Sequence, residues 1–156
     1  MSTDTKIIGG IAVITIAILF GSVFLFSNQQ SKETQVPEDQ IVAQNGLHWH
    51  PTLSISIKGK QQEISKDIGI GATHQPIHTH DVSGTLHMEM NGLITKEQTK
   101  LGNFFRIWGK EFNSSCIFDK CNGREGKVRF FVNGQENNQF ENYLMKDGDK
   151  IEIRYE

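Results

Sequence analysis

Residues 128–156 read VRFFVNGQENNQFENYLMKDGDKIEIRYE, and this stretch decides the fold that the sequence predicts. Apolar side chains recur at every second position in its first part, at Val128, Phe130 and Val132, which is typical of a strand with one buried face. The pair Asn133-Gly134 follows directly and is the strongest short signal for a hairpin. A second turn at 147–149 leads to a last strand, whose inward residues we expect to be Ile151, Ile153 and Tyr155.

The period changes upstream of this tail, at residues 99–109. The side chains of Leu101, Phe104, Phe105 and Trp108 follow a helical spacing of i, i+3, i+4 and i+7. We expect an amphipathic helix with Thr99 as its N-cap and Gly109 as its C-terminal stop. An aromatic stripe at this spacing is more often core than a ligand platform, so we assign it to the core.

Further upstream, residues 47–57 alternate apolar and polar side chains and predict one strand with a buried and a polar face. Pro51 lies in the first half of this strand, which suggests an edge position or a bulge. Lys58-Gly59 then turns the chain into a second short strand that ends near Ile64.

Hairpin, helix, strand, turn and strand follow one another in the order of a β-grasp domain. The tail VRFFVNGQENNQFENYLMKDGDKIEIRYE resembles the end of the ubiquitin-like sulfur-carrier proteins, with a VNG turn and a DGD turn. The resemblance implies an α+β, β-grasp-like domain in which residues from about 66 to 98 are a histidine-rich hairpin insertion. The chain ends at Tyr155-Glu156 without the Gly-Gly terminus of those carriers, so their function is not transferred.

The combined pattern LHWH…PIHTHDVSGTLH…LGNFFRIWG is similar to a family of membrane-anchored bacterial and archaeal proteins without an assigned function. This second resemblance spans nearly the whole domain. It implies anchoring to a membrane and no particular chemistry.

Residues 7–26, IIGGIAVITIAILFGSVFLF, form an uncharged run of 20 residues. At a rise of about 1.5 Å per residue, such a helix would span the ~30 Å hydrocarbon core of a bilayer. A cleaved signal peptide and a buried soluble helix are the alternatives, but the run is long for either. Lys6 before the run predicts a cytoplasmic N-terminus. We therefore expect a membrane anchor over 1–26, a flexible linker over 27–40 and an extracytoplasmic domain over 41–156.

All six histidines lie between positions 48 and 87. Three of them belong to residues 76–90, PIHTHDVSGTLHMEM, where Asp81 and Gly84 suit the two ends of a four-residue turn. That turn pairs His78 with His87. One face of the hairpin is then apolar, and the other carries His78, His80, Thr85, His87 and Glu89.

Three imidazoles that converge from two strands match the nitrogen ligands that a transition metal requires. We therefore predict that His78, His80 and His87 bind one metal ion, with His48 and His50 available from the first strand. Asp81 and Glu89 are candidates for ligands or for partners that orient the imidazoles. His74 falls in a glycine-bearing loop and is left out of this platform. Any single histidine here could equally be a solvated surface residue, so the clustering is the signal.

Imidazole ligands suit copper(II) and zinc(II), and the inferred location outside the cytoplasm slightly favours copper. Cys116 and Cys121 are the only cysteines, with four residues between them in CIFDKC, and in such a location they are expected to form a disulfide. A metal site at this pair is the weaker alternative, because no second cysteine pair accompanies it.

The formal net charge of −2, with both signs interleaved, argues against a nucleic-acid-binding protein. We therefore expect a membrane-anchored, extracytoplasmic protein that binds copper or zinc, or an accessory subunit of a membrane complex. The bilayer would be its partner through residues 7–26. A small histidine-ligated metalloenzyme with Glu89 or Asp81 as base, and a structural or docking module without a metal, remain the alternatives.

Overall fold

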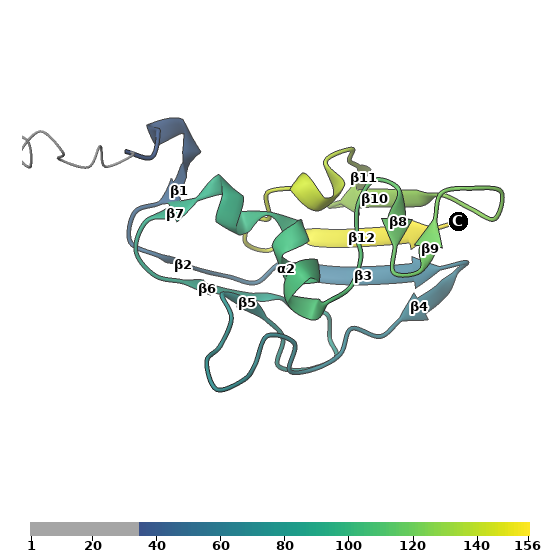
Figure 1. The fold of residues 1–156 in the computed structure, drawn as a ribbon, viewed down its shortest axis with the longest axis horizontal. Coiled ribbons are helices and arrows are strands. Elements are labelled where there is room, and N and C mark those ends of the chain that lie inside the picture. The colour runs from purple at the N-terminus through teal and green to yellow at the C-terminus, as the bar shows by residue number, and fades with distance from the viewer. Residues whose placement is uncertain (1–34) are drawn as a thin grey trace, which may run out of the picture. The chain divides into compact units, whose positions relative to one another are not determined.

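The computed structural model describes residues 35–156, and a five-stranded mixed sheet is its largest element. The strand order is β11 (Gln135–Glu136), β10 (Val128–Val132), β12 (Lys150–Tyr155), β3 (Thr52–Ile57) and β4 (Lys60–Gln62). The C-terminal strand β12 lies in the centre, parallel to β3 and antiparallel to β10. Residues 128–156 therefore supply three neighbouring strands of the sheet, β11, β10 and the central β12 (Figure 1).

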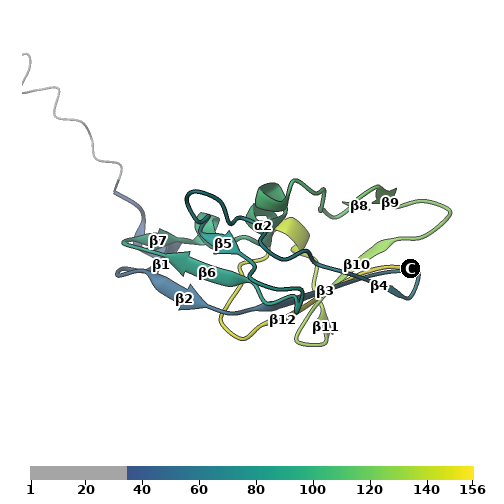
Figure 2. The same ribbon diagram turned by 90° about the horizontal axis from the view of Figure 1, so that it is seen from below.

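One α-helix, α2 (Leu101–Trp108), lies on one side of this sheet, together with the small hairpin of β8 (Cys116–Ile117) and β9 (Lys120–Cys121) (Figure 2). Three short 3-10 turns complete the helical content of the described residues: η1 (Glu38–Gln40), η2 (Lys96–Thr99) and η3 (Phe140–Asn142). The side chains that fill the space between helix and sheet are fully or almost fully buried: Leu53, Ile55, Leu101, Phe104, Phe105, Phe130, Ile151 and Ile153. Burial of each such side chain contributes about 1.5–3 kcal/mol.

Two further sheets lie toward the other end of the domain. Strands β2 (Leu47–Trp49), β6 (His87–Met90) and β5 (Ile77–His78) form a three-stranded antiparallel sheet with β6 in the middle. Strands β1 (Ile41–Ala43) and β7 (Ile94–Thr95) form a two-stranded sheet. The histidines belong to the three-stranded sheet and the loops beside it.

The expected fold class, α+β with a transmembrane helix ahead of a β-grasp-like domain, is wrong for the described residues. They are mostly β-sheet, with the eight-residue α2 as their one α-helix. The physical reason is that segments which we expected to form an insertion and loops instead pair with one another and form small antiparallel sheets. No helix within residues 35–156 is long and apolar enough to cross a bilayer. The predicted spanning helix, 7–26, lies outside the described residues.

The predicted single strand over 47–57 is divided at Pro51 into β2 and β3, which belong to different sheets. A proline has no N–H with which to continue a ladder. Its carbonyl instead accepts a hydrogen bond from the Leu86 N–H at 2.9 Å. Pro51 is thus the point at which the chain passes from the histidine-bearing sheet to the main sheet.

The ends of α2 agree only in part with the sequence expectation. Gly109 ends the helix as predicted, in the left-handed conformation with φ of 69°. Thr99 is not its N-cap, because Thr99 ends η2 and its hydroxyl donates to the Lys96 carbonyl at 3.0 Å. The capping interaction belongs to Thr95, which pairs with Gln98 at the start of η2.

Candidate metal centre

The histidine-bearing hairpin has the predicted register at its base, where His78 pairs with His87 across β5 and β6. Beyond this pair the ladder expected between Thr79 and Leu86 does not form. The Thr79 N–H donates to the Ile68 carbonyl at 3.0 Å, and its hydroxyl donates to the Ser65 carbonyl at 2.9 Å. Residues 79–86 therefore form a loop, and the predicted apolar face of the hairpin is nevertheless buried.

A pairing between distant segments brings the first strand to this hairpin. Strand β2 pairs with β6 so that His48 lies opposite Glu89 and Trp49 opposite Met88. One further step along the same antiparallel register places His50 opposite His87. Since side chains two residues apart point to the same face of a strand, His48, His50 and His87 share one face.

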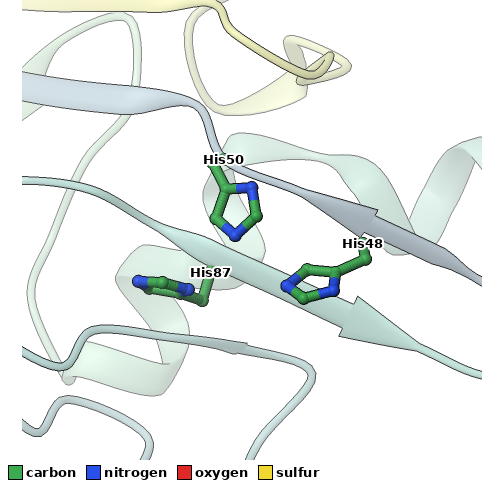
Figure 3. A group of neighbouring side chains, drawn as sticks. All are labelled: His48, His50 and His87. Carbon is green, nitrogen blue, oxygen red and sulfur yellow. The ribbon is translucent and has the colours of Figure 1, made fainter.

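Figure 3 shows these three imidazoles turned toward one another, two from the β2 side and one from β6. Their ligand nitrogens all lie within 4.8 Å of one another. The ring of His50 is 4.7 Å from that of His48 and 4.9 Å from that of His87, measured between centroids. Among residues 35–156, this is the one group of three or more candidate ligands at such spacing. We call it the outer trio.

Two members of the outer trio have a carboxylate contact. The His50 N–H donates to Asp147 Oδ1 at 2.7 Å, so the turn before β12 holds the residue that precedes Pro51. Glu89 Oε1 lies 3.3 Å from His48 Nε2, which gives Glu89 the predicted place beside an imidazole. A carboxylate in contact with a ligand imidazole orients the ring and increases its basicity.

Burial lowers the pKa of His87 below the usual histidine value of 6.5, and repulsion from the charged forms of His80, His50 and His78 lowers it further. His87 is therefore neutral at physiological pH, and a neutral imidazole is the form that binds a metal. Hydrogen bonds from Ser83 hold the pKa of the Asp81 carboxyl below its usual value, with a smaller contribution from His87 and His80. Asp81 is thus engaged with its own turn, where its Oδ1 accepts the Ser83 N–H at 2.8 Å.

The predicted trio of His78, His80 and His87 is also brought together, although its nitrogens do not reach the spacing of the outer trio. The ring centroids of His78 and His80 are 4.9 Å apart, those of His80 and His87 4.5 Å, and those of His78 and His87 5.6 Å. Contrary to the expectation of an exposed polar face, His78 is only 1% exposed. His80 is exposed.

Sequence reasoning set His74 aside, but the structure places its ring 5.3 Å from His78 and 6.4 Å from His80. All six histidines therefore form one continuous cluster, which we call the histidine cluster. The signal that could have included His74 is the confinement of every histidine to 40 residues. The contact of Asp147 with the His50 N–H had no signal in the sequence.

Cys116 and Cys121 form the expected disulfide, with an S–S distance of 2.05 Å. They are direct partners across β8 and β9. The bond closes a small hairpin that is separate in the sequence from the histidine cluster.

Comparisons with family models, with curated proteins and with solved structures gave no match.

Proposed function

We propose that this protein binds a transition-metal ion through the outer trio, with copper(II) and zinc(II) as the ions to be tested. The observation that carries the proposal is the convergence of three imidazole nitrogens within 4.8 Å of one another. A tetrahedral ion with metal–nitrogen bonds of about 2.0–2.1 Å needs nitrogens about 3.3 Å apart. Small rotations of exposed imidazoles such as His48 and His50 are enough to close this difference.

The backbone favours binding because two paired strands hold His48 and His87 before an ion arrives. His87 is on the central strand of its sheet, and His50 is held through its N–H by Asp147. Rigid strands position side chains more accurately than a loop does. A smaller reorganisation cost on binding follows from this arrangement.

The contacts of the carboxylates favour metal binding over the metalloenzyme alternative. A general base must be free to take a proton from a metal-bound water. Glu89 contacts His48, and Asp81 accepts hydrogen bonds from Ser83, so both carboxylates already have a positioning role. The convergence of the imidazoles likewise weighs against a docking module, in which they would point apart with separate hydrogen bonds.

We place this activity outside the cytoplasm, at the surface of the membrane. A disulfide supports this location because such bonds persist in oxidising compartments. The uncharged run of residues 7–26 supports it as well. An accessory role in a membrane complex is compatible with the same location.

The test is calorimetric titration of copper(II) and zinc(II) into the untagged full-length chain and two variants. Loss of a residue that only orients a metal ligand lowers metal affinity by about 10–100-fold. His50 is itself a proposed ligand, so His50→Ala should lower the affinity by more than about 100-fold. Gln61→Ala, an exposed change on β4 that leaves every imidazole in place, is the matched control and should bind as the wild type does. Wild-type protein that binds neither ion, or His50→Ala that binds as many ions as the control and as tightly, would contradict the proposal.

A further inference from the structure

His78 is a buried histidine with one nitrogen satisfied and the other without a partner. Its Nδ1 lies 3.0 Å from the Gln75 carbonyl oxygen. A carbonyl can only accept, so Nδ1 carries the proton and Nε2 carries the lone pair. Nε2 is buried and has no hydrogen-bond partner. Buried polar atoms are nearly always satisfied, and an exception needs an explanation.

The rings around His78 are those of other histidines. His80, His74 and His87 lie at 4.9, 5.3 and 5.6 Å from it, between centroids. Imidazoles that share a tetrahedral ion with bonds of about 2.0–2.1 Å have centroids about 5 Å apart. The spacing around His78 is therefore that of a ligand set. A histidine whose second nitrogen donates to a backbone carbonyl also has the hydrogen bond that metal-binding histidines usually make.

We propose that His74, His78 and His80 form a second metal position, the inner position, which takes an imidazole-binding transition-metal ion next to the ion of the outer trio. This inference rests on the proposed function and extends it from one ion to two. His78 is the fixed ligand, because it is buried and bonded through Nδ1. His74 and His80 are exposed and can rotate toward it.

Ligand number supports two ions over one. A zinc-type ion takes four ligands, whereas the histidine cluster offers six imidazoles. The outer trio is complete without His78, and the inner position uses none of the three outer residues. Two neighbouring dications repel each other, but Asp81 and Glu89 place negative charge beside the cluster. Several classes of enzyme hold two metal ions about 3.5–4 Å apart, so the repulsion between neighbouring dications can be overcome in a protein site.

The experiment measures stoichiometry with zinc(II) alone. Untagged full-length protein is titrated by calorimetry, and the bound zinc is then counted by elemental analysis after desalting. We expect two ions per chain for the wild type. His74→Ala/His80→Ala and His48→Ala/His50→Ala should each bind one, because each pair of exposed substitutions empties a different position.

A second measurement avoids any substitution of the buried residue. Long-range ¹H–¹⁵N spectra of the wild-type imidazoles should show the His78 Nε2 resonance moving on zinc addition and remaining still in His74→Ala/His80→Ala. If the wild-type chain binds one zinc ion and His48→Ala/His50→Ala binds none, the inner position is overturned and the proposed function stands. Two ions retained by His74→Ala/His80→Ala would also overturn it. No zinc bound to the wild type would overturn the proposed function itself.

Discussion

Metal binding at the outer trio should raise the thermal stability of the domain. The sharpest background for this test is His74→Ala/His80→Ala, which removes two exposed imidazoles and keeps His48, His50 and His87. Surface substitutions of this kind usually change stability by no more than about 0.5 kcal/mol. Any zinc-dependent shift in this background is then assigned to the outer trio.

The size of the shift can be worked out. An ion that binds only the folded state at a free concentration of 100 times its Kd stabilises that state by about 2.7 kcal/mol. Residues 36–156 form one compact unit. At about 2.1 cal/mol/K per residue, the total unfolding entropy of a unit of this size is about 0.25 kcal/mol/K. Dividing the stabilisation by this entropy gives a rise in Tm of about 10 °C.

The assay is thermal unfolding of the full-length chain followed by near-UV circular dichroism, with and without zinc(II) at 100 times the Kd of the background variant. The same background with His87→Ala should shift by no more than about 2 °C, because two imidazoles from one chain segment cannot hold the ion. If zinc raises the Tm of the variant without His87 as much as it raises the Tm of its background at the same free zinc concentration, the outer trio does not bind the ion.

Three further predictions follow from the same structure. Replacing both Cys116 and Cys121 by serine should lower the free energy of unfolding, measured in urea, by about 2 kcal/mol, as the chain-entropy relation gives for so short a loop. Reductant should destabilise the wild type alone, and equal stability of the two proteins would contradict this prediction. Burial and neighbouring histidines lower the pKa of His87 in the folded protein, so the unfolded chain protonates this imidazole at a higher pH than the folded chain does. The stability of the metal-free protein should therefore fall as pH drops below about 6.5. His87→Gln should flatten this dependence, and an unchanged slope in urea titrations at pH 8.0 to 5.5 would count against it. Protease added to intact cells should degrade residues 36–156 if the domain lies outside the cytoplasm, whereas cleavage only after lysis would exclude that location.

Local patterns predicted the local elements well. The register of His78 with His87 follows from the alternation of apolar and polar side chains, because a shift by one residue would mix the two faces. Asn133-Gly134 forms the predicted turn, with both residues at positive φ. The helix begins at Leu101 and ends before Gly109 because the aromatic stripe and the glycine both act within a few residues.

The fold class and the ligand geometry depend on contacts between distant segments, and the sequence carries no local signal for them. The pairing of β2 with β6 joins residues about 40 positions apart, and it creates the outer trio. The surroundings of His78 depend on tertiary structure in the same way, because imidazoles from a loop and a neighbouring strand lie next to it. The sequence therefore predicted that most of the histidines lie close together, but not how they are grouped.

Two residues explain why the histidine cluster forms where the two sheets meet. Pro51 lies between the end of β2 at Trp49 and the start of β3 at Thr52, so His50 lies in the short link that joins the two sheets. Gly84 has a φ of +83° and accepts the Leu53 N–H at 2.8 Å, and a Cβ at this position would collide with the Leu53 carbonyl oxygen. Only glycine allows this approach without strain. This hydrogen bond and the one from the Leu86 N–H to the Pro51 carbonyl hold the loop that carries His80 against the chain that follows His50. The main sheet thus positions the histidine cluster, although none of its own strands contributes a histidine to it.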